Sequence, residues 1–379
     1  MSSSQHIEVS TASARYVVTV GRGSSRRVAT LLADAGLRPA TCAIVCDAAV
    51  EPAARRVEAD LVAAGLGAAV LPVRASEAAK SLESLGELCD RMLSAGLDRA
   101  GVVVALGGGV VGDLAGFAAS VYMRGVPCVQ LPTTLLAMVD ASVGGKTAVN
   151  LLRADGTLAK NAIGTFAQPR LVACDPELLG TLPARELRSG LAECVKHAVI
   201  ADPSQLAWIE AKADPILAHD PDTLAELVAR NVRIKAAVVS ADEREDGVRA
   251  VLNLGHTFAH AIEALAHGEV THGEAVAIGT VAACRLGALV AGCPADAEAA
   301  VRRTLGRVGL PCAVPGSLGA DRLPGGRPLR GDYVLQPVGT HPGVVRLHQL
   351  ARLRARLPRD RDHGAQAPPR PGDQRARDL

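Results

Sequence analysis

The feature that most constrains the fold is the sequence VVVALGGGVVGDLAGF at residues 102–117. Its valine run predicts a buried strand, its three glycines a tight turn, and the apolar spacing after them the start of a helix. Glycines let the backbone approach a ligand closely, and the first turn of a helix offers unpaired N–H groups to negative charge. The turn therefore suits a diphosphate, although glycines also occur in such turns for packing reasons alone.

A second turn of this kind follows closely. An apolar strand predicted at 128–131 ends in Pro132-Thr133-Thr134, and the sequence SVGGKT follows at 142–147. Two turns suited to phosphate at such short spacing favour nucleotide binding over packing alone.

The residues around these turns alternate between short strands and amphipathic helices. Strands are predicted at 16–20, 42–46 and 68–73, and helices at 25–35 and 51–64. This alternation continues to about residue 173 and predicts a parallel sheet with helices on both faces. Asp47 follows one strand, and it can either reach a ribose hydroxyl or cap the next helix.

The pattern changes after residue 175. Apolar residues recur at helical spacing, and runs typical of strands disappear. We therefore predict an α/β domain at 1–173 and an all-α domain at 174–315, with a site in the cleft between them. Residues 316–379 are rich in Arg, Pro and Gly and contain no lysine, so we interpret them as an atypical, partly disordered tail.

Composition excludes several classes of function. A net charge of +2 and an aromatic content of 2% do not suit nucleic-acid binding. The sequence predicts neither a membrane span nor a secretory signal, so a soluble cytoplasmic protein is expected. The nine cysteines are scattered without CxxC pairs, which indicates small buried hydrophobic residues and not disulfides or a thiolate metal site.

Lysine is rare in this arginine-rich chain. The lysines are Lys80, Lys146, Lys160, Lys196, Lys212 and Lys235. Because arginine is used elsewhere, the remaining lysines suggest roles that need a compact point charge or a titratable donor.

Three elements of the second half carry side chains that can bind a metal. Glu193 lies with Lys196 in an otherwise apolar helix, His256 and His260 are four residues apart, and His272 begins a helix. An HxxxH pair alone is more often a partly buried helix face than a site. One glutamate and two histidines from separate elements would nevertheless form a three-ligand zinc site with an open position. An open metal can bind a substrate hydroxyl and lower its pKa.

Several long motifs together resemble the 3-dehydroquinate synthases, over about residues 10–310. They are GGGVVGDLAGFAASVYMRG, QLPTTLLAMVDASVGGKTAVN, KNAIGTFAQP, LPARELRSGLAECVKHAVI, ADEREDGVRAVLNLGHTFAHAIE and HGEAVAIG. The resemblance implies a Rossmann-like amino-terminal domain, a helical carboxy-terminal domain, NAD, zinc or cobalt, and a homodimer. It implies a lyase of the shikimate pathway, which converts 3-deoxy-D-arabino-heptulosonate 7-phosphate to 3-dehydroquinate and phosphate.

The resemblance also implies roles for individual residues. The implied metal ligands are Glu193, His256 and His272. The implied NAD contacts are Asp47, Glu77, Lys80, Gly109, Val110, Val111, Asp113, Thr133, Thr134, Asp140 and Asn161. The implied substrate and catalytic residues are Arg124, Lys146, Lys160, Lys196, Lys235, Arg249, Asn253 and His260, with Asn161 shared between the two sets.

The implied chemistry explains these residue types. NAD oxidises the C5 hydroxyl while zinc polarises that oxygen, phosphate leaves by β-elimination, the hydride returns, and an aldol step closes the ring. Lys146, Asn253, His260 and Arg124 are implied to bind phosphate, and Arg249 a carboxylate. The family also has a lysine pair at about 320–335, which is missing here, so that Arg322 and Arg327 are the alternatives for its role.

Three other functions fit the same motifs. They are an aminodehydroquinate synthase or another secondary-metabolic sugar phosphate cyclase, a metal-dependent polyol dehydrogenase, and an inactive binding subunit.

Overall fold

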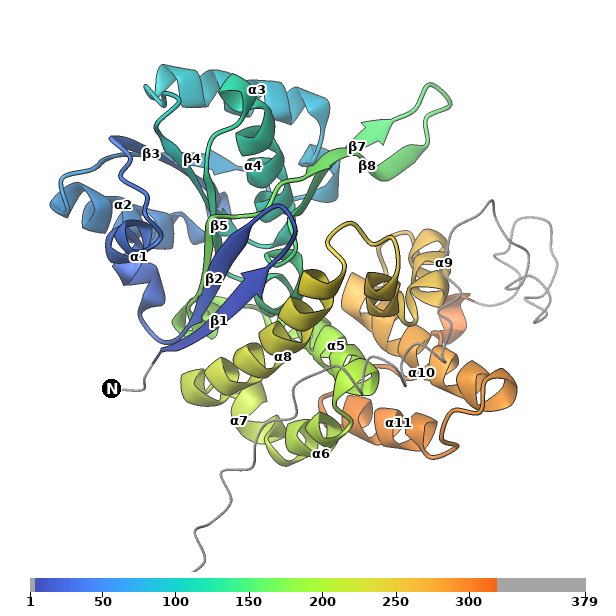
Figure 1. Cartoon of the computed structure of the whole chain (residues 1–379). Coiled ribbons are helices and arrows are strands. Elements are labelled where there is room, and N and C mark those ends of the chain that lie inside the picture. Colours follow the sequence, from blue (N-terminus) through green and yellow to red (C-terminus); the bar gives the residue numbers. More distant parts are fainter. Residues whose placement is uncertain (1–3, 319–379) are drawn as a thin grey trace, which may run out of the picture.

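The computed structural model describes residues 4–318. These residues form an α/β half around a seven-stranded sheet and a half made of helices (Figure 1). The predicted fold class, a Rossmann-like α/β part followed by an all-α part, is confirmed. Most of the predicted tail, with Arg322 and Arg327, lies outside the described residues.

The sheet is parallel except at one edge. Its order is β1-β2-β9-β6-β5-β3-β4, and only β1 and β2, among these neighbours, pair antiparallel. The antiparallel edge strand was not predicted. The strands are β1 (Gln5–Ser10), β2 (Arg15–Val20), β3 (Thr41–Asp47), β4 (Gly67–Val73), β5 (Val102–Gly107), β6 (Cys128–Pro132) and β9 (Leu171–Cys174).

Helices cover both faces of the sheet. Alternate residues of β3 point to opposite faces, so that Ile44 packs in one core with α1 and α2 and Val45 in another with α3 and α4. Burial on both faces explains the continuous apolar runs of the central strands. The helices are α1 (Val28–Asp34), α2 (Glu51–Ala63), α3 (Leu82–Ser94) and α4 (Gly109–Val121).

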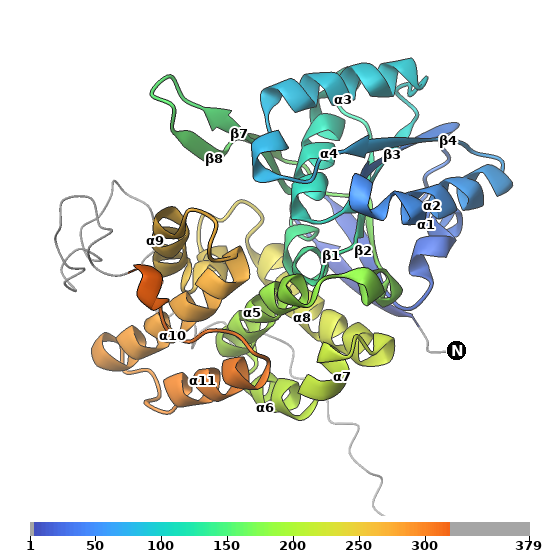
Figure 2. The same cartoon turned by 180° about the vertical axis from the view of Figure 1, so that it is seen from behind.

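A two-stranded hairpin projects from this half (Figures 1 and 2). It consists of β7 (Lys146–Leu152) and β8 (Leu158–Phe166), and its base contacts α4. The sequence analysis did not predict it. Short helical turns join other elements: η1 (Ser24–Arg27), η2 (Ala48–Val50), η3 (Glu77–Ala79), η4 (Tyr122–Arg124), η6 (Pro176–Thr181), η7 (Val248–Asn253) and η8 (Gly316–Leu318), together with the π-helix η5 (Ala137–Ala141).

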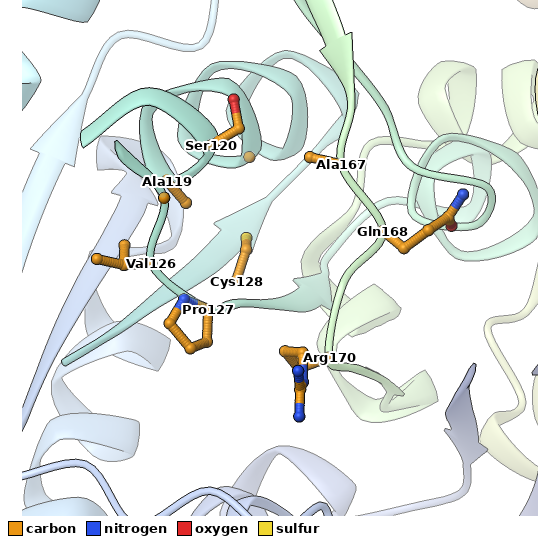
Figure 3. Close-up of a pocket in the computed structure, with 10 residues that line it drawn as sticks. Ala119, Ser120, Val126, Pro127, Cys128, Ala167, Gln168 and Arg170 are labelled. Carbon is orange, nitrogen blue, oxygen red and sulfur yellow. The ribbon is translucent and has the colours of Figure 1, made fainter. Parts of the chain in front are cut away.

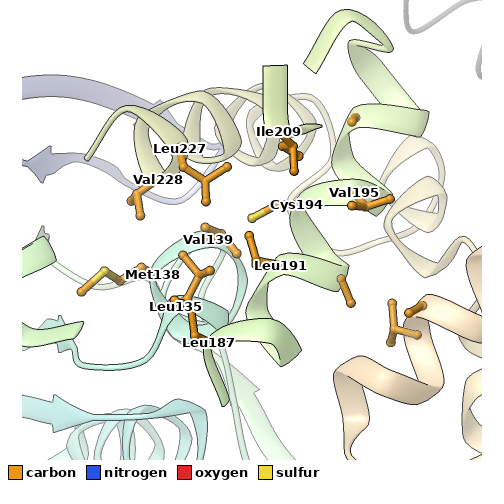
Figure 4. Close-up of a cluster of buried hydrophobic side chains, with 14 of the residues drawn as sticks. Leu135, Met138, Val139, Leu187, Leu191, Cys194, Val195, Ile209, Leu227 and Val228 are labelled. Carbon is orange, nitrogen blue, oxygen red and sulfur yellow. The ribbon is translucent and has the colours of Figure 1, made fainter. Parts of the chain in front are cut away.

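The helical half is built around α5. This helix contacts α6, α8, α10 and α11, and its apolar face meets residues of η5 and α8 (Figure 4). The same core extends to β1 and β2, so the two halves share one hydrophobic core. The helices are α5 (Ala184–Ala201), α6 (Ser204–Ala211), α7 (Ala213–Leu217), α8 (Pro221–Ala241), α9 (His256–Ala266), α10 (His272–Val290) and α11 (Ala297–Arg307).

Within residues 4–318, α10 is one helix that is long and apolar enough to cross a membrane. It packs against α5, α9 and α11, and about 56% of the apolar window is buried inside the protein. This is the environment of a core helix.

Candidate functional site

The structure brings Glu193, His256 and His272 together from three helices. Glu193 lies in the middle of α5, whereas His256 and His272 are the first residues of α9 and α10. Glu193 Oε1 is 3.9 Å from His256 Nε2 and 3.5 Å from His272 Nε2, and one ligand atom from each residue lies within 4.8 Å of the others. The three residues could therefore hold a metal ion together, and we call them the metal cluster.

Local sequence explains how His272 reaches α5. Thr271 caps α10 and forms a capping box with Glu274, which fixes where the helix begins. Gly273 then lies directly on α5, where a Cβ atom would be only 2.2 Å from the carbonyl oxygen of Ser189. A glycine at this position allows the close approach that places His272 beside Glu193.

The environment of Glu193 fits a metal ligand. Its side chain is fully buried, and among residues 4–318 neither carboxylate oxygen has a hydrogen-bond partner of ordinary geometry. Burial would raise the pKa of Glu193, but the Lys196 ammonium, together with His272 and His256, holds it below its usual value. An ionised carboxylate with free lone pairs is the form that a cation needs.

The two histidines differ in charge. Burial, helped by Lys196, lowers the pKa of His256 to about 4, so its imidazole is neutral. Burial would also lower the pKa of His272, but its contacts with Glu193 and Glu263 raise that pKa to about 10. The His272 ring therefore lies between two carboxylates, and a divalent cation would replace the proton on Nε2, which faces Glu193. One carboxylate and two imidazoles suit zinc or cobalt.

Two buried lysines adjoin the metal cluster. Lys196 forms an ion pair with Glu193, and Lys235 forms one with Asp140 of η5. Lys235 Nζ also donates a hydrogen bond to the backbone carbonyl of Asp140, at 2.5 Å. His197 was not selected from the sequence. Ligand atoms of His197, Asp140 and Glu193, one from each residue, lie within 4.8 Å of one another. His197 Nδ1 contacts Asn231 Oδ1 at 3.2 Å. Because that amide oxygen only accepts, His197 donates from Nδ1, and its pKa is lowered to about 4 by burial.

A second group of predicted site residues surrounds the carboxylate of Glu245, a residue for which no role was predicted from the sequence. Lys146 pairs with Glu245, and Asn253 Nδ2 donates to Glu245 Oε1 at 2.6 Å. The nearby Arg249 is 2% exposed and donates to the backbone carbonyls of Glu243 and Gly144. Gly144 has a φ of +102°, and a Cβ atom there would be 2.4 Å from the guanidinium of Arg249. Gly144 therefore leaves the space that the Arg249 guanidinium occupies.

His260 and Lys160 lie close to the α9 part of the metal cluster. The His260 ring meets that of His256 edge to face, with centroids 5.5 Å apart. Lys160, on β8, is 3.6 Å from Glu263 of α9, and Glu263 in turn contacts His272 Nδ1 at 3.3 Å. The hairpin therefore reaches the helical half beside the metal cluster.

Most predicted NAD residues lie at the carboxyl edge of the sheet. α4 begins at Gly109, directly after β5, with Val110 and Val111 in its first turn, and Thr133 donates its backbone N–H to Gly107. Lys80 is 3% exposed, pairs with Asp113 and donates to Asn161 Oδ1 at 2.5 Å.

Further hydrogen bonds complete this edge. Asn150, which the sequence analysis did not select, donates to Glu77 Oε2 at 2.8 Å and accepts from the Asn161 backbone. Thr134 Oγ1 accepts from Ala137 N and so begins the turn that leads into η5. Asp47 Oδ1 accepts a hydrogen bond from Ala49 N at 3.0 Å. Of the two roles considered for Asp47, this is the capping of the following helix.

The structure does not bring Arg124 to the metal cluster within this chain. It lies in η4, beyond the carboxyl end of α4, about 20 Å along that helix from the glycine turn. A pocket of about 300 Å³ opens at this end, lined by the last turns of α4, the start of β6 and residues 167, 168 and 170 (Figure 3). This pocket is separate from the metal cluster.

Comparisons with known proteins agree with the sequence motifs. Sequence profiles of the 3-dehydroquinate synthase N-terminal and C-terminal regions match residues 70–189 and 190–323. The 3-dehydroquinate synthase of Bordetella pertussis is 46% identical over 318 residues, which are 83% of this chain and 86% of that protein.

Solved structures of sugar phosphate cyclases share the fold. A 2-deoxy-scyllo-inosose synthase complexed with carbaglucose-6-phosphate, NAD+ and Co2+ has a TM-score of 0.76 at 26% identity, covering 84% of this chain and 86% of that one. The 2-epi-5-epi-valiolone synthase of Streptomyces hygroscopicus, with NAD+ and Zn2+ bound, has a TM-score of 0.70 at 32% identity, covering 79% and 82%. The resemblance inferred from the motifs is confirmed: the chain belongs to the 3-dehydroquinate synthase family.

Proposed function

We propose that this chain is a 3-dehydroquinate synthase that uses NAD and a divalent metal ion, zinc or cobalt, to convert 3-deoxy-D-arabino-heptulosonate 7-phosphate to 3-dehydroquinate and phosphate. The observation that carries the proposal is the metal cluster of Glu193, His256 and His272. It lies beside the Asp140–Lys235 pair, in a chain that is 46% identical to a curated synthase.

The bound groups would supply two kinds of chemistry: NAD accepts and returns a hydride, and the metal ion polarises a substrate hydroxyl. The buried lysines prepare this site. Lys196 keeps Glu193 ionised, and Lys235 holds Asp140 next to the cluster through two contacts. Both ammonium groups are buried, so they act in a medium that screens their charge weakly.

The group around Glu245 supports an anionic substrate. Lys146 and Asn253 hold the Glu245 carboxylate in the structure, so the same donors can bind a phosphate oxygen when substrate enters. Arg249 Nε is buried, and among the described residues it has no hydrogen-bond partner. A buried donor without a partner next to these residues suits a substrate carboxylate.

We further propose the finer features that the resemblance implies. The enzyme is a carbon–oxygen lyase of the shikimate pathway, acts in the cytoplasm as a homodimer, and binds neither nucleic acid nor membranes. Its Rossmann-like domain is proposed to cover 1–173 and its metal and substrate domain 174–315. The support for these features is the family membership and the hydrophobic core that the two halves share.

The proposal is tested by assaying inorganic phosphate after the chain is mixed with NAD, zinc and 3-deoxy-D-arabino-heptulosonate 7-phosphate. We expect phosphate release without net accumulation of NADH, because the hydride is returned. A polyol dehydrogenase would accumulate NADH, and an inactive subunit would release no phosphate. Faster turnover of the amino analogue of the substrate would instead identify an aminodehydroquinate synthase.

A further inference from the structure

Glu263 stands out because its two carboxylate oxygens contact different parts of the molecule. Its Oε2 is 3.3 Å from Nδ1 of His272, and its Oε1 is 3.6 Å from Nζ of Lys160 on the projecting hairpin. The Glu263 side chain is 17% exposed, so its contact with His272 is partly shielded from water, whereas Lys160 is 53% exposed. No role for Glu263 was predicted from the sequence.

The position of Glu263 follows from helical spacing. His256, His260 and Glu263 are separated by four and three residues, so they share one face of α9. That face is turned towards the start of α10, where the His256 and His272 rings lie with centroids 5.5 Å apart. Glu263 is thus fixed one helical turn beyond His260, on the far side of His272 from Glu193.

The contacts define which nitrogen of His272 faces the metal cluster. Nε2 faces Glu193 at 3.5 Å, whereas Nδ1 faces Glu263. A carboxylate that accepts a hydrogen bond from Nδ1–H fixes the orientation of the ring and leaves the lone pair on Nε2, where a metal ion would bind. His256 has the same arrangement with a different acceptor, because its Nδ1 lies 3.5 Å from the backbone carbonyl of Leu254.

We propose that Glu263 is a positioning residue for the metal: it holds His272 with Nε2 towards the ion, and through Lys160 it links the metal cluster to the hairpin. This inference rests on the proposed metal site and extends it beyond the three ligands. The Lys160 contact is about half exposed, so it adds little to metal affinity itself. The Lys160 contact instead acts on the hairpin. Glu263 can pair with Lys160 of the hairpin only while the His272 ring keeps the Glu263 side chain in place.

The test compares the zinc dissociation constants of purified variants, measured by competition with a chromogenic chelator. Glu263→Gln keeps the shape and removes the charge, and we expect it to weaken zinc binding 10- to 100-fold. Lys160→Met should stay within about threefold of the wild type, because Lys160 contacts the other carboxylate oxygen. Glu298→Gln, which changes a partly buried glutamate paired with Arg302 on α11, is the matched control and should change nothing.

Two further measurements separate positioning from a general loss of structure. The visible absorption of the cobalt-loaded Glu263→Gln protein should change shape, which a merely less stable protein with intact ligands would not show. In the zinc-loaded wild type, nitrogen NMR of labelled histidine should find the His272 proton on Nδ1; a proton on Nε2 would overturn the proposal even if the variant did not fold.

The outcomes also separate this inference from the proposed function. If the wild type binds no zinc, the metal site itself is wrong. If the wild type binds zinc and Glu263→Gln binds it equally well with an unchanged cobalt spectrum, the role of Glu263 is refuted and the metal site stands. Hydrogen exchange of β8 should slow when zinc is added to the wild type but not to Lys160→Met; equal slowing in both would remove the link to the hairpin.

Discussion

The buried pair of Glu193 and Lys196 gives a prediction that needs no substrate. Both side chains are almost inaccessible, at 0% and 1% exposure, and they lie on adjacent turns of α5. Glu193→Gln in the metal-free protein would leave the Lys196 ammonium buried without its main partner. Breaking a buried pair from one side costs about 3–5 kcal/mol. Asp140 also attracts Lys196, so we expect a value near the lower end, about 3 kcal/mol.

The double variant Glu193→Gln/Lys196→Met provides the comparison. It removes both charges and fills a similar volume, and such replacements of buried pairs are often neutral or stabilising. We therefore expect most of the lost stability to return, even though neither variant binds metal. The loss in the single variant should also shrink as the pH rises, because a neutral Lys196 no longer carries a buried charge.

The assay is urea unfolding of chelator-treated proteins, followed by circular dichroism. Wild type, both single variants and the double variant form a cycle that isolates the coupling of the two side chains. A loss below about 1 kcal/mol for Glu193→Gln, or a double variant less stable than Glu193→Gln, would refute the reasoning that Glu193 compensates the buried charge of Lys196.

Other predictions concern pH, packing and substrate. Because the pKa of His272 is raised from 6.5 to about 10, its contribution to the stability of the metal-free protein should be complete below pH 6.5 and lost as the pH rises through 10. Since zinc must displace a proton from His272, zinc affinity should rise about tenfold per pH unit from 7 to 9, which a chelator titration measures. Gly273→Ala places a methyl group against Ser189, so it should lower the unfolding free energy by about 1–3 kcal/mol and weaken zinc binding, whereas Gly306→Ala, in open space on α11, should do neither. Arg249→Lys should raise KM more than it lowers kcat in the phosphate assay, because lysine cannot pair bidentately with a carboxylate; an unchanged KM would contradict that role.

The α/β half could be predicted well because its signals are local. The strand before the glycine turn is buried on both faces, and that burial requires the apolar run that the sequence shows. The edge strand β1 was missed because its residues alternate between exposed and buried and carry charge, as in many loops. The hairpin was missed because most of β8 is exposed, so no apolar pattern marks it.

The metal cluster could be proposed from residue types, but its surroundings could not. Glu193 was recognisable as a carboxylate in an apolar helix. Glu245 lies in an acidic stretch that resembles a solvated loop, and only the fold brings Lys146 and Asn253 to it. Glu263 carried a usable signal, its seven-residue spacing from His256, but the acceptor of the His272 proton depends on where α10 begins.

The burial of α5 has a consequence for how substrate enters. Since this helix is enclosed by the core that also holds β1 and β2, a wide hinge motion between the halves would uncover apolar surface on every side of it. We therefore expect access to depend on parts outside that core, such as the projecting hairpin. We also expect the two halves to move as one rigid body, with motion during substrate entry confined to the hairpin.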